Sequence, residues 1–242
     1  MSLTYFFDIG NTRGKFWKCA NGEVEAKAEV VHAGAMSELV SSIPPAFTET
    51  PDKICGVMVL DKETTCAFAN ICKARWGRPV EFVKSTPTFG DIKNGYEVPE
   101  LLGADRWLGL IAVGKVDDKV CIVSVGTAFT LDVLENGVHQ GGYILPGLRV
   151  MADALHLSTA GVRPQFQPTK SRGGLGRSTA EAVANGALAA YQGLISGVVA
   201  EYGISRTILT GGDAEKLSAH LALPHTVRSD LLLTGLQRYF SR

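Results

Sequence analysis

The chain has 242 residues, of which 45% are hydrophobic and 20% are charged, and its 24 basic side chains are balanced by 24 acidic ones. This length allows one large domain or two smaller halves, each long enough to bury a core. The balanced charge excludes a strong field for nucleic acid or an anionic membrane, and no stretch approaches the ~20 apolar residues of a membrane span. We therefore expect a small-molecule partner, with no nucleic acid and no membrane.

The first half of the chain is predicted to open with three strands, because two turn-forming pairs, Gly10-Asn11 and Asn21-Gly22, interrupt apolar runs. Alternating helices and strands follow. The strands are predicted over 4–9, 13–19, 23–31, 54–60 and 80–83, the helices over 36–43, 63–76 and 101–116, and a turn-rich loop over 85–99.

The second half repeats this plan, with Asn136-Gly137 again supplying a hairpin turn. Strands are predicted over 120–123, 129–134, 137–144 and 207–209, helices after Pro146-Gly147 and over 179–202, 214–221 and 231–240, and an irregular segment over 161–176. The chain is therefore predicted to have two similar halves, residues 1–116 and 117–242.

Two short glycine turns follow corresponding strands of the two halves, Asp8–Thr12 in the first and 124–128 in the second. Glycine lets backbone amides approach a phosphate closely, and a carboxylate at a strand end, such as Asp8, can hold a hydrated Mg²⁺. Lys15 could neutralise phosphate charge. The alternative for the first turn is an ordinary hairpin with a surface lysine, but the pair of turns favours one nucleotide held between two halves.

A third turn, Thr210-Gly211-Gly212, follows a strand and precedes a helix. Its glycines could let an adenosine lie against backbone near a helix N-terminus. The alternative is a helix-capping turn, a role that Asp213 would serve equally well.

This plan resembles the duplicated ribonuclease H-like fold, an α/β fold shared by acetate and sugar kinases, chaperone ATPases and actin (the actin-like ATPase fold). The resemblance implies that the nucleotide lies in a cleft between the two halves. Fold alone does not give the reaction.

A more specific resemblance covers almost the whole chain and is to the type III pantothenate kinase family. It is carried by six blocks in the right order: Asp8–Thr12, Asn94–Arg106, Gly126-Thr127-Ala128, Gly141–Gly147, Gly176-Arg177-Ser178-Thr179 and Thr210-Gly211-Gly212.

The resemblance implies ATP-dependent phosphorylation of pantothenate to 4′-phosphopantothenate, the first step of coenzyme A biosynthesis, with Mg²⁺ and ATP as cofactors. Asp105 matches the family's proton acceptor, as an alcohol nucleophile requires. The matching ATP-binding positions are Asp8, Ile9, Gly10, Asn11, Thr12, Arg13, Gly14, Lys15 and Thr127. The matching substrate-binding positions are Tyr96, Gly103, Ala104, Asp105, Arg106 and Thr179.

Several of these residues could have a structural role instead of the functional one that the resemblance implies. Arg106 could bind the substrate carboxylate in a bidentate fork or merely orient Asp105, and the two could form a structural salt bridge at a helix start. Tyr96 could simply pack at a turn, and Thr179 could cap a helix. In the family the matching threonine reaches the site from the second subunit, so the resemblance also implies a homodimer.

One position departs from the family. Ser124 stands where many members have an aspartate that binds an activating K⁺ or NH₄⁺ ion. The resemblance therefore implies a monovalent cation, K⁺ or NH₄⁺, which backbone carbonyls or Asp132 could hold in place of the missing aspartate, and no metal-binding residue is assigned.

The cysteines and histidines, which could in principle bind a metal or take part in catalysis, are interpreted as structural. Neither the cysteines nor the histidines have metal-ligand spacing. We expect reduced core thiols in a cytoplasmic protein, and structural histidines throughout. The residues concerned are Cys19, Cys55, Cys66, Cys72, Cys121, His32, His139, His156, His220 and His225.

Two other functions compete with the kinase. Members of the same family have been described as Bvg accessory factors, which suggests a transcriptional accessory protein without kinase activity, although the neutral charge argues against DNA binding. An ATPase or sugar kinase of the same fold is the third possibility, but it leaves the Gly103–Arg106 block without an explanation.

Overall fold

A computed structural model describes residues 2–32, 47–114, 118–158 and 174–241. The helix predicted over 36–43 and most of the irregular segment predicted over 161–176 lie outside these residues. The chain forms two compact units. Unit 1 comprises Met1–Phe89, Tyr96–Val113 and Leu232–Arg242, and unit 2 comprises Gly90–Gly95 and Gly114–Leu231.

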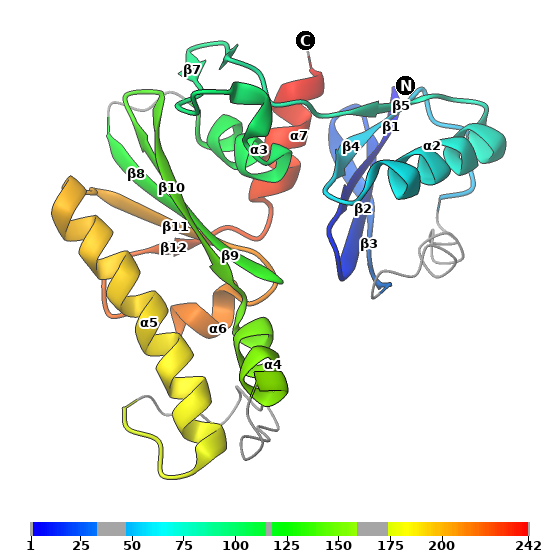
Figure 1. The fold of residues 1–242 in the computed structure, drawn as a ribbon. Helices are drawn as coiled ribbons and strands as arrows, with labels where there is room; N and C mark the ends of the chain where they lie inside the picture. Colours follow the sequence, from blue (N-terminus) through cyan, green and yellow to red (C-terminus); the bar gives the residue numbers. More distant parts are fainter. Residues whose placement is uncertain (1, 33–46, 115–117, 159–173, 242) are drawn as a thin grey trace. The chain divides into compact units, whose positions relative to one another are not determined.

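Unit 1 is built on a five-stranded sheet in the order β3-β2-β1-β4-β5 (Figure 1). The first three strands are antiparallel neighbours, whereas β4 and β5 run parallel to β1. The elements are β1 (Leu3–Ile9), β2 (Arg13–Ala20), β3 (Glu23–Val31), β4 (Lys53–Met58), α2 (Lys62–Trp76), β5 (Val80–Phe82), β6 (Thr88–Phe89), the 3₁₀ helix η1 (Pro99–Leu101), α3 (Ala104–Val113) and α7 (Leu231–Phe240).

Alternation along β1 separates the two cores of unit 1. Tyr5, Phe7 and Ile9 face a cluster that includes Phe68 of α2. Phe6 faces the opposite cluster, where α3 and α7 contribute the residues Leu108, Leu233 and Leu236. The sheet is therefore covered by helices on both faces.

Unit 2 repeats this topology in a seven-stranded sheet of order β12-β11-β8-β9-β10-β7-β6. Here β8, β9 and β10 are antiparallel neighbours, and β11 and β12 run parallel to β8. The elements are β7 (Ile92–Lys93), β8 (Lys119–Val125), β9 (Ala128–Glu135), β10 (Val138–Pro146), α4 (Leu148–Ser158), α5 (Thr179–Tyr202), β11 (Arg206–Thr210), α6 (Ala214–Ser218) and β12 (Thr226–Val227).

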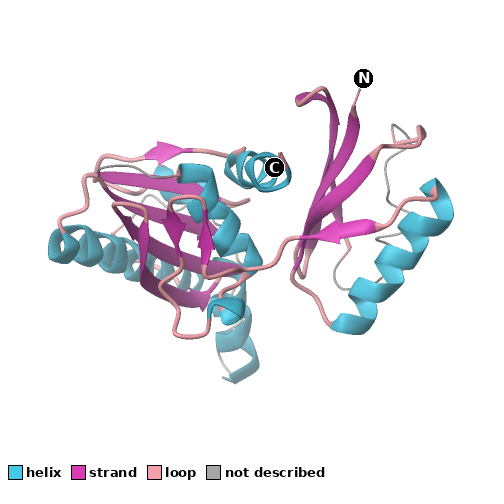
Figure 2. Ribbon diagram, turned by 90° about the horizontal axis from the view of Figure 1, so that it is seen from above, coloured by secondary structure: helices cyan, strands magenta, loops and turns pink. Residues whose placement is uncertain are grey.

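The core of unit 2 lies between one face of this sheet and helices α4, α5 and α6 (Figure 2). Tyr191 and Ile195 of α5 are fully buried against Val123 and Phe129. By length and composition α5 could cross a membrane. Its buried residues belong to this core, so it is accounted for as a core helix of unit 2.

The predicted order of elements in the described residues is confirmed in most places. Three predictions need correction. The helix predicted over 214–221 is the shorter α6, and the strand β12 that follows it was not predicted. The loop predicted over 85–99 contains two short strands, β6 and β7, and begins η1. The helix predicted from residue 101 begins at Ala104, because Leu101 belongs to the separate turn η1. The duplicated α/β sheet plan, with helices packed on the sheets, is the predicted ribonuclease H-like architecture.

Candidate active site

The first glycine turn joins β1 to β2. Asp8 is on the same face of β1 as Phe6, the face on which α3 packs, and its partner across the hairpin is Lys15. Residues directly opposite in an antiparallel pair point to the same side of the sheet. The hairpin therefore places a carboxylate and an ammonium group side by side at the end of β1.

The turn itself is closed by a hydrogen bond from the amide of Gly10 to the carbonyl of Arg13, at 2.9 Å. The Arg13 guanidinium forms an exposed ion pair with Glu29 of β3, also at 2.9 Å. Ile9 is fully buried and Gly14 is its partner in β2. These contacts hold Asn11 and Thr12 at the tip of the turn.

Asp8 has the most perturbed carboxylate of this hairpin. Burial raises the pKa of Asp8 to about 6; the nearby Lys15 charge lowers it, while the charges of Asp105 and Glu29 raise it further. Asp105 acts on Asp8 because α3 packs on the face of β1 that carries Asp8. Glu29 had no signal in the sequence, because β3 alternates charged and small residues along its exposed length.

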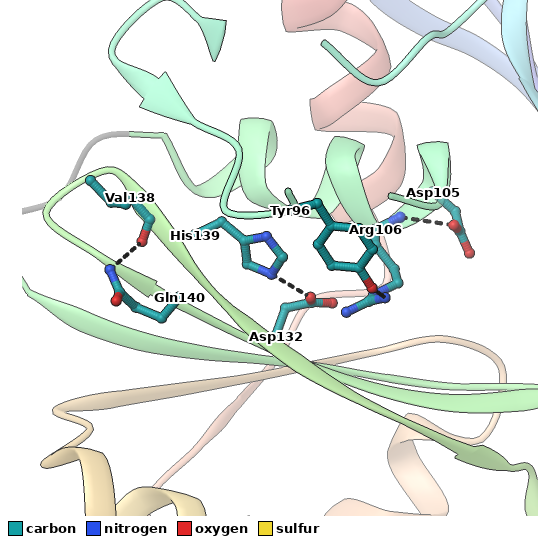
Figure 3. Close-up of polar contacts among 7 residues, drawn as sticks. All are labelled: Tyr96, Asp105, Arg106, Asp132, Val138, His139 and Gln140. Atoms are coloured by element: carbon teal, nitrogen blue, oxygen red, sulfur yellow. Dashed lines mark hydrogen bonds and ion pairs between the residues drawn. The ribbon is translucent and has the colours of Figure 1, made fainter. Parts of the chain in front are cut away.

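Asp105 lies in the first turn of α3, and its carboxylate turns back over the helix start. Its Oδ1 atom accepts a hydrogen bond from the backbone amide of Arg106 at 2.9 Å (Figure 3). A Cβ atom at position 103 would lie 2.7 Å from that same oxygen. Glycine at 103 therefore leaves the space that the Asp105 side chain occupies.

The Arg106 guanidinium contacts Tyr96. Its Nη1 donates a 2.6 Å hydrogen bond to the Tyr96 hydroxyl, and Cζ is 5.5 Å from the ring centroid (Figure 3). Arg106 is only 7% exposed, so this charge is largely removed from water. The Arg106 backbone amide also donates to the Asp105 carboxylate, so one residue contacts both Tyr96 and Asp105. Tyr96 and Arg106 thus form a hydroxyl-guanidinium pair beside the catalytic carboxylate candidate.

Three glycine turns meet in unit 2. A Cβ at Gly147 would lie 2.1 Å from the carbonyl oxygen of Gly126, and one at Gly211 would lie 2.3 Å from that of Val125. The Gly147 amide donates to the carbonyl of Thr127 at 2.8 Å. The second phosphate-turn candidate and the third, adenosine-turn candidate are therefore in direct contact.

The third turn leads into the short helix α6. Asp213 is at its N-cap position but forms no side-chain capping bond; its Oδ1 instead contacts Nζ of Lys216 at 2.5 Å. The side-chain capping role considered for Asp213 is therefore not observed.

Ser124 lies in a row of hydroxyl side chains. Its partners across the sheet are Thr130 on β9 and Thr210 on β11. Asp132 was considered as a substitute cation ligand. Its Oδ1 atom accepts a hydrogen bond from Nε2 of His139 at 2.8 Å, and both side chains are buried (Figure 3). Asp132 is thus engaged by an imidazole two residues beyond Thr130 along β9.

Thr179 is the first residue of α5 and is exposed. The N-cap is Ser178, whose hydroxyl accepts the Glu181 amide at 3.2 Å, while the Glu181 carboxylate accepts the amide of Arg177. Because Ser178 fills the capping position, Thr179 is not needed as a cap.

A duplicated ribonuclease H-like fold, with a glycine turn after the first strand of each repeat and an aspartate near the first turn, places the chain in the actin-like ATPase fold class. Known structures agree on the fold. One is a Campylobacter jejuni protein described as a putative Baf family transcriptional activator. It superposes with a TM-score of 0.68 at 18% identity, and the match covers 98% of this chain and 97% of the Campylobacter chain. MreB5 of Spiroplasma citri bound to AMPPNP matches at a TM-score of 0.53 and 10% identity, over 100% of this chain and 96% of its own.

The sequence comparisons are more specific. The family described as type III pantothenate kinase matches residues 5–201. A type III pantothenate kinase of Acinetobacter baumannii is 36% identical over 243 aligned residues, which cover 98% of this chain and 96% of the relative. The chain belongs to the type III pantothenate kinase family, and it is a kinase.

Proposed function

We propose that the residues of the candidate site carry out the reaction of this family: the chain phosphorylates pantothenate with ATP, giving 4′-phosphopantothenate for coenzyme A biosynthesis. The primary hydroxyl oxygen attacks the γ-phosphorus, the bond to the β-phosphate oxygen breaks, and ADP leaves. The hydroxyl proton passes to the Asp105 carboxylate. The observation that carries this proposal is that Asp8, at the end of β1 beside the first glycine turn, lies on the sheet face against which α3 packs, and that Asp105 is in the first turn of α3.

Both turns are assigned to the phosphates of ATP. Gly10 and Gly126 support this assignment, because a Cβ would meet nothing closer than 3.7 Å at Gly10 and 4.0 Å at Gly126, and neither has a positive φ. The protein's own packing therefore does not require glycine there, whereas a closely approaching phosphate would. The assigned residues are Asp8, Ile9, Gly10, Asn11, Thr12, Arg13, Gly14, Lys15 and Thr127.

ATP is used with a divalent metal, and Asp8 fits a hydrated Mg²⁺. Its carboxylate is an oxygen ligand at a strand end, and burial already opposes its ionisation, so a cation beside it would favour the charged form. The metal supplies neutralisation of phosphate charge. Asp8 holds it, and Lys15 adds a second positive charge.

Pantothenate is assigned to the other side of Asp105. The buried guanidinium of Arg106 is suited to the substrate carboxylate, and its bond to the Tyr96 hydroxyl fixes the direction of the fork. Gly103 and Ala104 line the same helix start. This favours carboxylate binding over orientation of Asp105 as the role of Arg106.

We assign no residue to a monovalent cation. Ser124 and its neighbours Thr130 and Thr210 offer neutral hydroxyls, and Asp132 is engaged by His139. A neutral ligand set attracts K⁺ or NH₄⁺ less than a carboxylate does. A requirement for either ion is tested by comparing initial rates in potassium, ammonium and sodium salts of equal ionic strength.

A homodimer in the cytoplasm completes the proposal, with Thr179 contributed to the partner's site. Unit 2 exposes large apolar side chains on and next to α4, Leu157 at 84% and Ile144 at 62%. The neighbouring helix α5 exposes small residues at helical spacing: Ala182, Gly186, Ala189, Gly193, Gly197 and Ala200. A second copy covering this surface would bury the exposed apolar groups.

The central test is Asp105→Asn. Asparagine keeps the size and can still accept the Arg106 amide, but it does not accept the proton, so kcat should fall at least ~100-fold. ADP release is measured with and without pantothenate. The matched control is Glu63→Gln, the same loss of charge in the first turn of α2. Retention of more than a tenth of wild-type kcat by Asp105→Asn would exclude the assigned role.

A further inference from the structure

His32 lies directly after β3 and beside the first glycine turn. Its backbone amide donates to the carbonyl of Thr12 at 3.0 Å, which extends the β2–β3 ladder by one step beyond the pair Val31–Arg13. The side chain is 1% exposed. A buried imidazole is therefore packed against the backbone of the turn.

The ring makes a second contact with the same turn. His32 Nε2 is 2.9 Å from the carbonyl oxygen of Gly10. A carbonyl only accepts hydrogen bonds, so Nε2 carries the hydrogen and donates it. His32 thus binds the turn on both sides of Asn11, through Gly10 and through Thr12.

Through the planar peptide bond, this contact also fixes the direction of the Asn11 N–H group. The Gly10 carbonyl and the Asn11 N–H belong to one planar trans peptide, in which the two groups point in opposite directions. Because the carbonyl points at the buried His32 ring, the Asn11 N–H points away from it. Gly10 would otherwise permit this peptide plane to rotate at little cost.

We propose that His32 is a positioning residue for the nucleotide, which holds the Gly10 carbonyl so that the Asn11 amide faces a phosphate oxygen. This inference rests on the proposed function, since it takes the turn to be a phosphate site. The role assigned to His32 is exerted through the backbone of the turn, and no contact with the substrate or the reacting atoms is assigned to it.

The test compares two substitutions at position 32. His32→Phe keeps a buried ring but removes the donor, whereas His32→Gln keeps a side-chain N–H of similar reach. We expect His32→Phe to weaken binding of Mg²⁺-AMPPNP, measured by calorimetry, by roughly 10-fold and to raise KM for ATP equally, because a misdirected amide no longer binds phosphate. KM for pantothenate should stay within about 2-fold, and His32→Gln should recover part of the loss.

A control separates positioning from a general loss of stability. Tyr5→Phe, in the same unit, removes another side-chain bond to a backbone carbonyl, that from the Tyr5 hydroxyl to Glu49 at 2.8 Å. It should lower the melting temperature without changing nucleotide affinity. The proposal is overturned if His32→Phe binds Mg²⁺-AMPPNP as wild type does, or if KM for pantothenate rises as much as KM for ATP.

The same measurements distinguish this inference from the proposed function. Wild-type protein that binds Mg²⁺-AMPPNP but does not phosphorylate pantothenate would refute the assigned reaction and leave the effect of His32→Phe on nucleotide binding measurable. Wild-type protein that binds no nucleotide would overturn both. If His32→Phe does not fold, His32→Asn, whose shorter side chain cannot reach as far, takes its place beside His32→Gln.

Discussion

At the scale of single residues, Asp8 shows a conflict between stability and chemistry. Burial and the charges of Asp105 and Glu29 oppose ionisation of its carboxylate, whereas the charge of Lys15 favours it. A residue kept in an unfavourable charge state is typical of functional sites, where the cost is offset elsewhere in the fold. A metal ion or another cation bound next to Asp8 would offset the cost of ionising it.

Asp8→Asn should therefore stabilise the protein without nucleotide while impairing catalysis. The folded pKa of about 6 exceeds the ordinary 3.8, so the stability that protonated Asp8 provides is complete below pH 3.8 and is lost as the pH rises through 6. At pH 7.5 the variant should gain about 1–2 kcal/mol in free energy of unfolding, less than the full shift implies because the side chain is not completely buried. Near pH 3.8 the gain should vanish. Urea unfolding at the two pH values measures the difference.

The control is the same substitution at Asp61, the N-cap of α2. Hydrogen bonds from the Thr64 amide and hydroxyl lower the pKa of Asp61, so Asp61→Asn should lose stability above its pKa instead of gaining it. A lower stability of Asp8→Asn than of wild type at pH 7.5 would contradict the role of burial at Asp8.

At the scale of elements, the glycine turns differ in whether the fold itself requires a glycine. Gly211 has φ +95°, and its Cβ would overlap the Val125 carbonyl. Gly126 has neither constraint. Gly211 is required by the packing between two turns of unit 2. Gly126, in contrast, has open space in front of it. A glycine-to-alanine substitution in each turn therefore separates an effect on folding from an effect on ligand binding.

We expect Gly126→Ala to fold normally but to raise KM for ATP by about 10-fold, because the methyl group stands where a phosphate approaches. Gly211→Ala should instead lower the free energy of unfolding by at least ~2 kcal/mol, through strain at positive φ and the backbone clash. Thermal unfolding and steady-state kinetics of both variants measure this. Unchanged kinetics in Gly126→Ala would mean that the second turn does not contact phosphate.

At the scale of the whole molecule, the sequence predicted the local elements well because their signals are local. The hairpin turns at Asn21-Gly22 and Asn136-Gly137 adopt the expected positive φ values, and α5 spans the predicted 179–202. The duplication was also visible, since both repeats use a meander followed by parallel strands. Asp105, Arg106 and Tyr96 could be named because they lie in one short block.

Contacts between distant segments could not be predicted in this way. The ring of His32 binds a backbone carbonyl 22 residues earlier, which no side-chain pattern encodes. The C-terminal helix α7 packs its leucines, including Leu236, against Phe6 and Leu108 of unit 1, although it is last in the chain. Such contacts depend on the order of strands and on which face a helix covers, and these become known only when the sheets are assembled.

Two chains are expected to assemble through an exposed apolar surface of unit 2. The exposed Leu157 and Ile144 of unit 2 favour a homodimer, so sedimentation should give twice the 25.8 kDa of one chain. Leu157→Asp places a charge in the proposed interface and should shift the protein to monomer at micromolar concentration. It should also lower kcat/KM for pantothenate, because Thr179 would no longer reach the partner's site. Val24→Asp, at an exposed valine of β3 in unit 1, is the matched control and should remain dimeric. A wild-type monomer with full activity would contradict both the dimer and the role of Thr179.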